Sequence, residues 1–203
     1  MTAAILLLAT RSDGKLRELR PLFASAGFEV ADLREAALPP SPDEDAVEAF
    51  DTFEANALAK ARYFHALTGR PAIADDSGLE VDALSGQPGV RSKRWSGRSD
   101  LTGQSLDDAN NARLLDVLRD VHHPVARYVC AAAYVDGTRE EITRGETSGI
   151  IVRTGRGEHG FGYDPYFFSV ELGATFGESL REAKERVSHR GRAFRALLAR
   201  LQR

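Results

Sequence analysis

Two continuous apolar runs constrain the fold of this chain more than any other feature of its sequence. Residues 4–9 read AILLLA and residues 128–135 read YVCAAAYV. Such runs are typical of strands buried on both faces of a sheet, and we expect the second to be a central strand. After the first run and a polar turn, apolar residues recur at helical spacing from Leu16 and end before Gly27, a plausible helix cap. The sequence therefore predicts sheet strands covered by helices.

Other periodic segments predict the remaining elements. We expect helices over residues 52–67, 105–121 and 178–187, and a last helix with the apolar stripe Phe194, Leu197, Leu198 and Leu201. We expect strands over residues 28–33, 79–84, 140–144 and 147–152, with a hairpin turn at Asp136-Gly137. Residues 38–49 are rich in proline and acids, which predicts a loop, and Glu48 is the acid we expect to turn inward.

The composition excludes several classes of protein. A net charge of −3 argues against a nucleic-acid coat or a membrane-surface binder, because both need a broad basic face. No apolar run approaches the length of a membrane span. The single cysteine, Cys130, lies in the second apolar run, so we expect it to be buried and unable to form an internal disulfide. These features fit a globular protein of the reducing cytoplasm.

Two adjacent carboxylates, Asp75 and Asp76, follow the short apolar run at residues 72–74. Ser77 and Gly78 come next and predict a turn. Adjacent like charges repel, and partial burial raises the cost further. A pair at the end of a buried strand therefore indicates a bound cation or a proton-transfer role. A solvated Asp-Asp turn is the alternative, and this stretch alone slightly favours it.

A lysine on the helix predicted over residues 52–67 supports the first interpretation. On a helical wheel, Asn56 and Lys60 fall on the stripe defined by Phe53, Phe64 and Leu67. A lone lysine on such a stripe usually extends its ammonium group to the surface. Because Asn56 lies one turn earlier and an acidic pair follows on the next strand, a lysine in a functional site is the more economical interpretation.

Two further segments have the form of ligand sites. The polar turn at residues 10–15 joins a buried strand to a helix, as in a phosphate cradle, although such turns alone are more often structural. Residues 155–165 combine four glycines with Phe161 and Tyr163, which suits close backbone approach and stacking; a flexible loop anchored by its aromatics is the alternative. Lys184 and the pair His189-Arg190 flank a junction of two helices, where cations also favour a helix C-terminus.

Taken in order, these segments resemble the inosine triphosphate pyrophosphatase family, which hydrolyses non-standard purine nucleoside triphosphates. The matching segments are residues 10–15, FEANALAKA at 53–61, ADDSGLEVDAL at 74–84, PGVRSKR at 88–94, GFGYDP at 160–165, and SHRG at 188–191 with Lys184 before it. Each is weak alone, but together they are specific. The resemblance implies one elongated α/β domain over residues 1–203, with a long mixed sheet, flanking helices, two lobes around a central cleft, and a homodimer.

The resemblance also assigns roles by position. It implies that Asp76 is the proton acceptor when ITP, dITP or XTP is hydrolysed to the monophosphate and pyrophosphate. It implies a Mg²⁺ ion held by Asp76, Glu48 and Asp75. It implies a triphosphate site made of Thr10, Arg11, Ser12, Asp13, Gly14, Lys15, Lys60, Ser77 and Lys184. It implies a base site made of Phe161, Gly162, Tyr163, Asp164, His189 and Arg190.

Three positions depart from the family pattern. Ser12 stands where the family usually has Asn, Ala55 replaces a common acid, and Arg91 replaces a usual aromatic residue. The Ser12 departure predicts one weaker hydrogen bond to phosphate or ribose.

The residue chemistry agrees with these roles. Magnesium prefers hard oxygen ligands, and lysines stabilise charge that develops on a leaving pyrophosphate. The chain lacks a candidate Ser or Cys nucleophile with a base, which favours direct attack by water. Two alternatives stay open: a related pyrophosphatase for pyrimidine or modified bases, and a nucleotide sensor without turnover. A sensor would not need a carboxylate that activates water.

Overall fold

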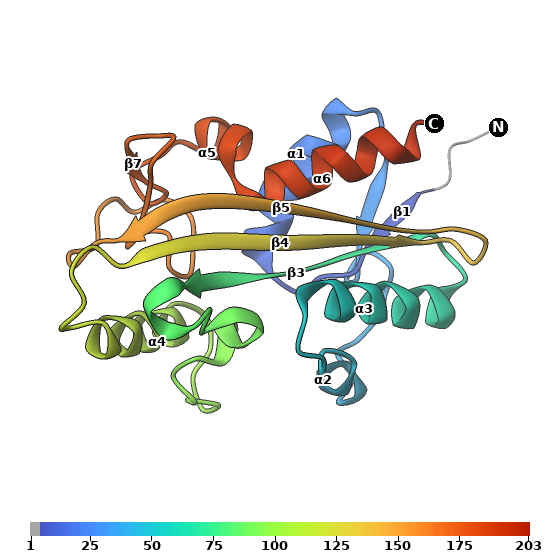
Figure 1. Ribbon diagram of the computed structural model, residues 1–203. Coiled ribbons are helices and arrows are strands. Elements are labelled where there is room, and N and C mark those ends of the chain that lie inside the picture. The colour runs from blue at the N-terminus through green and yellow to red at the C-terminus, as the bar shows by residue number, and fades with distance from the viewer. Residues whose placement is uncertain (1–4) are drawn as a thin grey trace. The chain divides into compact units, whose positions relative to one another are not determined.

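The computed structural model describes residues 5–203. Within this range seven strands form one sheet in the order β2-β1-β3-β4-β5-β6-β7 (Figure 1). β1 (Leu6–Leu8) is parallel to β2 (Val30–Asp32) and to β3 (Ala72–Val81). β6 (Phe167–Ser169) is antiparallel to β5 (Glu140–Ile151) and to β7 (Ala174–Thr175). The sheet is therefore mixed, and the predicted α/β fold is confirmed.

The apolar run at residues 128–135 is a central strand, as expected. It belongs to β4 (Val125–Val135), which is fourth in the order of seven strands within the described chain. Every residue from Tyr128 to Val135 is buried, including Cys130, because helices cover both faces of a central strand.

The chain divides into two compact units, and three long strands pass through both. Unit 1 contains the chain up to Asp76, Cys130–Gly145 and Arg190–Arg203; unit 2 contains Ser77–Val129 and Glu146–His189. The boundaries fall inside β3, β4 and β5. Asp75 and Asp76 are thus the last residues of β3 that belong to unit 1.

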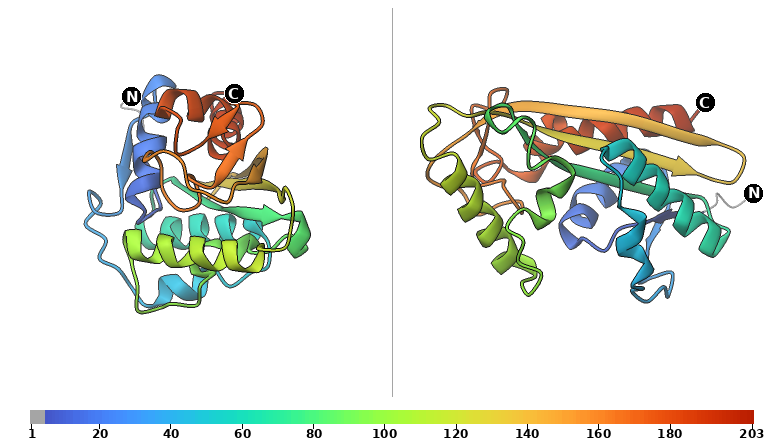
Figure 2. Two further views of the ribbon diagram at one scale, coloured as in Figure 1. Left: turned by 90° about the vertical axis from the view of Figure 1, so that its left-hand side faces the viewer. Right: turned by 60° about the horizontal axis from the view of Figure 1, so that its bottom comes forward.

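Unit 1 packs helices on both faces of its strands. α1 (Asp13–Ser25) and α6 (His189–Leu201) cover one face, and α3 (Phe53–Thr68) covers the other, as Figures 1 and 2 show. The short helix α2 (Asp43–Val47) precedes α3. Phe23 and Phe194 are fully buried, with ring centroids 5.7 Å apart, and join α1 to α6. The last-helix stripe is confirmed, since Phe194, Leu197 and Leu198 are all buried.

Unit 2 is organised around an aromatic core. It contains two short 3₁₀ helices, η1 (Asp82–Leu84) and η2 (Gly89–Arg94), and the α-helices α4 (Gly103–Val117) and α5 (Arg181–Val187). Tyr128 of β4 packs on Phe167 and Phe176, with ring centroids 4.7 Å and 5.8 Å away. Leu114 and Leu118 from α4 and its C-cap complete this core and are fully buried.

The predicted turn at Asp75-Asp76 is wrong, because β3 runs unbroken through these residues to Val81. The residues Asp-Asp-Ser-Gly have a high turn propensity. In an extended strand, however, successive side chains leave opposite faces of the sheet. Each carboxylate can then find its own partners, and the chain does not need to turn.

Other predicted boundaries also change. The two strands predicted over 140–144 and 147–152 form one strand, β5, in which buried and more exposed residues alternate from Thr143 to Ile151. Leu67, expected on the apolar stripe of the helix over 52–67, faces outward and is 57% exposed. Val117, in the helix expected over 105–121, is 40% exposed. The predicted loop over residues 38–49 contains α2.

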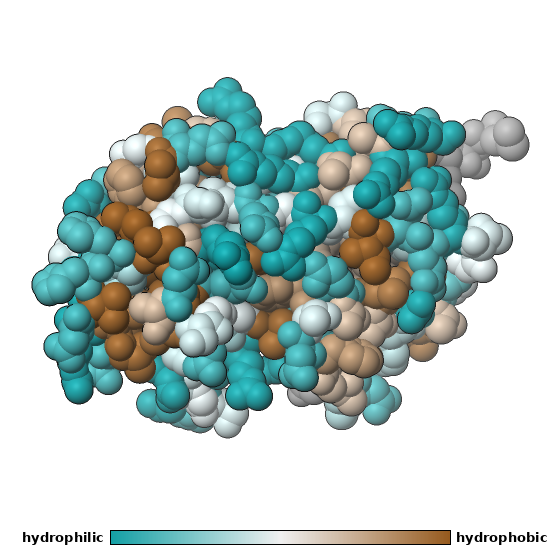
Figure 3. All heavy atoms as spheres, viewed as in Figure 1, coloured by the Kyte–Doolittle hydropathy of each residue, from teal (hydrophilic) through white to brown (hydrophobic). Residues whose placement is uncertain are grey.

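The described surface mixes apolar and polar side chains. On the face drawn in Figure 3, brown apolar atoms lie among teal polar ones. The large apolar side chains that are exposed in residues 5–203 are Ile5, Phe50, Leu67, Val117, Val125, Val170 and Leu180. Exposed apolar side chains that occur singly are normal on a folded protein. Among the described helices, none is both long and apolar enough to cross a membrane.

Candidate active site

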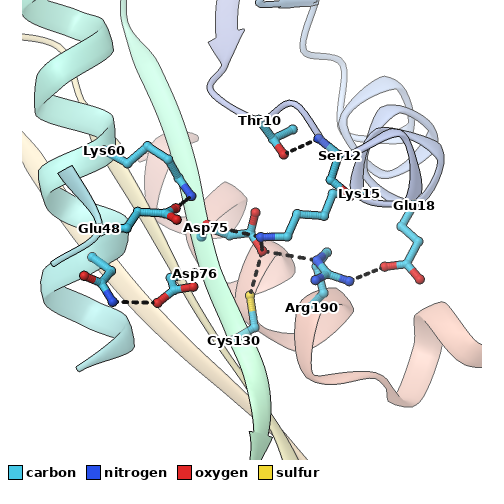
Figure 4. Close-up of polar contacts among 11 residues, drawn as sticks. Thr10, Ser12, Lys15, Glu18, Glu48, Lys60, Asp75, Asp76, Cys130 and Arg190 are labelled. Carbon is cyan, nitrogen blue, oxygen red and sulfur yellow. Dashed lines mark hydrogen bonds and ion pairs between the residues drawn. The ribbon is translucent and has the colours of Figure 1, made fainter. Parts of the chain in front are cut away.

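The carboxylates of Asp75 and Asp76 leave β3 toward different helices. Asp75 contacts Lys15 of α1 and Arg190 of α6, whereas Asp76 accepts a hydrogen bond from Asn56 of α3. Figure 4 shows Lys15 and Arg190 on one side of β3, with Lys60 and Glu48 on the other. Adjacent residues of one strand therefore place negative charge on both faces of the sheet.

Asp75 is held as a buried anion. Its side chain is 1% exposed, and its Oδ2 atom lies 3.0 Å from the ammonium group of Lys15 and 3.3 Å from Nε of Arg190. Arg190 also donates to Glu18, so the guanidinium joins two carboxylates. Burial raises the pKa of Asp75, but the charges of Lys15 and Arg190 outweigh it and hold that pKa well below its usual range.

Asp76 has the opposite environment. Its Oδ2 atom accepts a hydrogen bond of 2.9 Å from the side-chain amide of Asn56. Burial raises the pKa of Asp76 above its usual range, against the opposing effects of Lys15 and Asn56. Neighbouring carboxyl groups whose pKa values move apart are suited to different tasks. Asp76 is the better proton acceptor of the two.

Glu48 and Lys60 form an ion pair next to this carboxylate. Glu48 is the C-cap of α2, and Lys60 lies on α3 one turn after Asn56. Burial lowers the pKa of Lys60, but the charges of Glu48 and Asp75 raise it above its usual range. Burial likewise raises the pKa of Glu48, and Lys60 lowers it below the usual range. Both groups stay charged, and the ammonium group of Lys60 faces a carboxylate instead of bulk water.

The turn at residues 10–15 supplies one side chain to the carboxylate cluster. Ser12 caps α1, since its hydroxyl accepts from the amide of Lys15 at 3.3 Å, and the hydroxyl of Thr10 accepts from the amide of Ser12 at 3.2 Å. Lys15 then reaches Asp75. Gly14 is buried inside the first turn of the helix.

The other two charged residues of this turn are engaged elsewhere. Arg11 pairs with Glu44 at 2.7 Å and donates to the carbonyl of Leu38 at 2.8 Å. Asp13 is exposed and pairs with Arg34. Arg11 therefore joins the turn to α2 and to the segment before it.

Unit 2 holds a second cluster, centred on the buried ion pair of Asp164 and Lys184. Asp164 Oδ2 lies 2.6 Å from the Lys184 ammonium group and accepts from the amide of Phe161 at 2.8 Å. The same ammonium group lies 5.3 Å from the ring centroid of Phe161 and 5.2 Å from that of Phe176. A Cβ atom at Gly160, which has φ +78°, would lie 2.0 Å from Asp164 Oδ2, so only glycine fits there.

Two aromatic rings of the predicted base site have defined partners. The Tyr163 hydroxyl donates to the carbonyl of Ser92 at 2.8 Å. The ring of His189 stacks on Tyr128, with centroids 4.5 Å apart and planes at 7°. The first contact attaches Tyr163 to η2, and the second packs His189 against β4.

Helix α4 fixes the backbone of the glycine-rich segment, a role that the sequence reasoning did not assign. The amide of Gly162 donates to Asp107 Oδ2 at 2.8 Å, and its carbonyl accepts from Asn111 at 2.9 Å. Asn110 accepts from the amide of Ser96 at 2.7 Å. A signal was present in the sequence: these polar residues share the helix face of Leu114 and Leu118, and a buried amide needs a partner.

The structure groups two predicted site residues differently from the resemblance. Arg190, expected beside the base, has its guanidinium between Asp75 and Glu18 in unit 1. Lys184, expected beside the triphosphate, lies in the second cluster with Asp164 and Phe161. Ser77 follows Asp76 in β3 and is half-buried.

The carboxylates also bear on whether a metal could bind. Within the described part of the chain, no three His, Cys, Asp or Glu side chains lie close enough to form a ligand set alone. Asp75 Oδ1 is buried and has no hydrogen-bond partner among the described residues, and Asp76 and Glu48 offer further oxygens. Magnesium commonly uses one or two carboxylates and completes its shell with water and substrate phosphates. The donor set fits magnesium that binds together with phosphates.

The fold and the first cluster define an α/β protein with a buried site of lysines and carboxylates across one sheet strand. The chain belongs to the Ham1 family, whose model matches residues 6–200. The family assignment drawn from the sequence motifs is therefore confirmed.

Individual relatives match along almost their full length. A Frankia alni protein named dITP/XTP pyrophosphatase is 48% identical over 194 residues, which is 94% of each chain. A Nocardia farcinica protein of the same name is 49% identical over 202 residues, covering 98% of this chain and 95% of that one.

Solved structures agree with the fold. A HAM1 protein from Coxiella burnetii superposes with a TM-score of 0.83 at 32% identity, covering 98% of both chains. A nucleoside-triphosphatase / dITP/XTP pyrophosphatase from Mycobacterium abscessus has a TM-score of 0.73 at 41% identity, covering 97% of this chain and 98% of that one.

Proposed function

We propose that this protein is a nucleoside-triphosphate pyrophosphatase that hydrolyses dITP, XTP and ITP to the monophosphate and pyrophosphate. The observation that carries the proposal is the carboxylate pair in β3: Asp75 is ion-paired with Lys15 and Arg190, whereas Asp76 accepts a hydrogen bond from Asn56. Burial raises the pKa of Asp76, while the neighbouring cations depress that of Asp75. The charges of Lys15 and Lys60 both act on Asp76. The names of relatives with 48% and 49% identity support the same activity.

Asp76 is the proposed proton acceptor. A carboxylate with a raised pKa can take a proton from water in the transition state, and such general-base catalysis typically contributes ~10²–10⁴-fold. Lys15 and Lys60 lie where positive charge can stabilise the leaving pyrophosphate. Asp75 holds Lys15 in place through their ion pair of 3.0 Å.

Magnesium is part of the proposal. Asp76 and Glu48 would hold the ion. Asp75, which the resemblance adds as a third ligand, is ion-paired with Lys15 and Arg190 on the other face of the sheet. A bound magnesium ion would neutralise part of the triphosphate charge and lower the pKa of a coordinated water. The ion pair with Lys60 keeps Glu48 ionised, which a metal ligand requires.

We propose that the second cluster recognises the base. Phe161 offers a stacking face, and Lys184 and Asp164 fix its position. Hypoxanthine and xanthine carry an oxygen acceptor at the six position, whereas adenine carries an amino donor. His189 can donate a hydrogen bond to such an oxygen. Adenine would leave this imidazole donor without an acceptor. The guanidinium of Arg190, which the resemblance also assigns to the base site, is instead paired with Asp75 and Glu18.

The proposal also covers location and assembly. Hydrolysis of free nucleotides would take place in the cytoplasm. The substrate would be a small molecule, and neither nucleic acid nor a membrane would be a partner. The homodimer implied by the resemblance is tested by light scattering of the purified protein.

A substrate panel tests the function. With magnesium present, kcat/KM is measured for dITP, XTP, dATP, dGTP, dCTP and dUTP. We expect dITP and XTP to exceed dATP by ~10²-fold or more, since an enzyme site with unpaired buried donors rejects the wrong base strongly. A preference for dCTP or dUTP would instead support a pyrimidine pyrophosphatase. Tight binding of dITP without turnover would support a sensor.

A further inference from the structure

Asn56 connects three segments that carry the proposed catalytic groups. Its side chain is buried, with 1% of the residue exposed. Its Oδ1 atom accepts from the amide of Phe50 at 2.9 Å, and its Nδ2 atom donates to the carbonyl of Phe50 at 3.1 Å. The same Nδ2 atom donates to Asp76 Oδ2 at 2.9 Å. Both N–H groups of this amide are therefore used.

The paired bonds to Phe50 fix the position of Glu48. Phe50 follows Glu48 by two residues, and Asn56 holds both backbone polar groups of Phe50. Lys60 lies one turn after Asn56 on α3, on the same side of the helix, and pairs with Glu48. One amide thus sets how Glu48 and Lys60 lie relative to Asp76.

A role limited to helix capping does not account for this geometry. Thr52 already caps α3, since its hydroxyl accepts from the amide of Ala55 at 3.2 Å. The backbone amide of Asn56 bonds to the Thr52 carbonyl at 3.1 Å. Two side-chain hydrogen bonds of Asn56 hold the backbone of Phe50, which precedes α3. The third goes to the carboxylate of Asp76. A hydrogen bond to an ionised acceptor is shorter and stronger than one between two neutral groups.

We propose that Asn56 is a positioning residue that holds the Asp76 carboxylate in place relative to Glu48 and Lys60. This inference rests on the proposed function, because Asp76 and Glu48 are its proposed base and metal ligands. Asn56 acts through these carboxylates and touches no reacting atom. Its loss lowers kcat and metal affinity and leaves KM for the nucleotide nearly unchanged.

The test compares Asn56→Ala and Asn56→Asp with the matched control Thr52→Ala. Asn56→Ala removes the donor, whereas Asn56→Asp keeps the shape and adds a negative charge toward Asp76. Thr52→Ala removes a hydrogen bond at the same end of α3 without touching Asp76. We measure kcat and KM for dITP and the thermal midpoint. We also measure Mn²⁺ binding by electron paramagnetic resonance in the presence of pyrophosphate, which supplies phosphate oxygens without turnover.

We expect Asn56→Ala to lower kcat and weaken Mn²⁺ binding by ~10–100-fold each, the range seen when a partner of a metal ligand is lost. We expect KM to stay within about twofold, as when an interaction made only in the transition state is removed. The kcat of Asn56→Asp should fall at least as far as that of Asn56→Ala, even if Asn56→Asp has the higher thermal midpoint. Thr52→Ala should melt lower and keep parental kcat and Mn²⁺ affinity.

Two results would overturn the inference: parental kcat and Mn²⁺ affinity in Asn56→Ala, or activity losses that follow the thermal midpoint across all three variants. If Asn56→Ala does not fold, the same-shaped Asn56→Asp carries the kinetic test. Absence of dITP hydrolysis by the parent protein would reject the proposed function, while the Mn²⁺ titration would still decide whether Asn56 positions the carboxylates.

Discussion

Asp75 and Asp76 are consecutive residues of β3, yet their Oδ2 atoms accept from Lys15 at 3.0 Å and from Asn56 at 2.9 Å, on opposite faces of the sheet. A strand makes this separation available to any adjacent pair. Here the separation lets one carboxylate stay fully ion-paired while its neighbour keeps a raised pKa. The two residues should therefore respond very differently to the same substitution.

Asp76→Asn should abolish most activity and leave the fold intact. The amide cannot accept a proton from water, so we expect kcat for dITP to fall by at least ~10²-fold. The folded state should persist, because Asn56 can still bond to an amide oxygen. Steady-state kinetics and circular dichroism check both parts. A folded variant with near-parental kcat would show that the carboxylate is structural.

Asp75→Asn should instead destabilise the protein. Asp75 is 1% exposed and neutralises Lys15 and Arg190. Its loss leaves Lys15 without this carboxylate and Arg190 with Glu18 as its remaining ion-pair partner. Breaking a buried pair typically costs about 3–5 kcal/mol of unfolding free energy. Asp13→Asn is the matched control, since the Asp13–Arg34 pair is exposed and an exposed pair contributes little. Urea denaturation measures the unfolding free energy of both variants. Equal losses in Asp75→Asn and Asp13→Asn would contradict a stabilising role for the buried Asp75 ion pairs.

The stabilising effect of Asp75 should depend on pH in one direction. Its folded-state pKa lies below the ordinary value of about 3.9 for aspartate. A depressed pKa contributes stability that is present above the unfolded-state pKa and is lost as pH falls toward the folded-state pKa. The difference in unfolding free energy between parent and Asp75→Asn should thus be constant near neutral pH and shrink below about pH 4. A difference that grows on acidification would contradict this account.

Lys184→Met should affect both stability and nucleotide binding. Lys184 is 5% exposed and is the ion-pair partner of Asp164, whose carboxylate also fixes the amide of Phe161. We expect a loss of a few kcal/mol, about 3–5 for a broken buried pair, and a higher KM for dITP as Phe161 moves. Arg181→Met on the same helix, where the arginine pairs with Glu182 at the surface, should change neither. If a folded Lys184→Met variant kept the parental KM for dITP, Phe161 would have no role in binding the base.

Much of the fold follows from sequence periodicity. The helical spacing from Leu16 corresponds to α1, and α3 lies within one residue of the predicted range, between its caps Thr52 and Gly69. Buried strands were evident as apolar runs. The turn predicted at Asp75-Asp76 failed because local propensity was outweighed by tertiary partners, chiefly Lys15 and Arg190, which are distant in sequence.

The residue types of the candidate site were predictable, but their grouping was not. His189 and Arg190 are adjacent, yet the imidazole stacks on Tyr128 and the guanidinium pairs with Asp75. Their directions depend on the bend between α5 and α6, which a motif does not encode. Asn111 was missed for a related reason, since its partner is a backbone carbonyl at Gly162.

In the proposed reaction, Asp76 and the lysines around it direct water to the triphosphate so that pyrophosphate leaves. The most direct test incubates the protein with dITP and Mg²⁺ and separates dIMP, dIDP, pyrophosphate and orthophosphate by ion-exchange chromatography, without added phosphatase. The account predicts equal amounts of dIMP and pyrophosphate from the start of the reaction. Accumulation of dIDP with orthophosphate would contradict it.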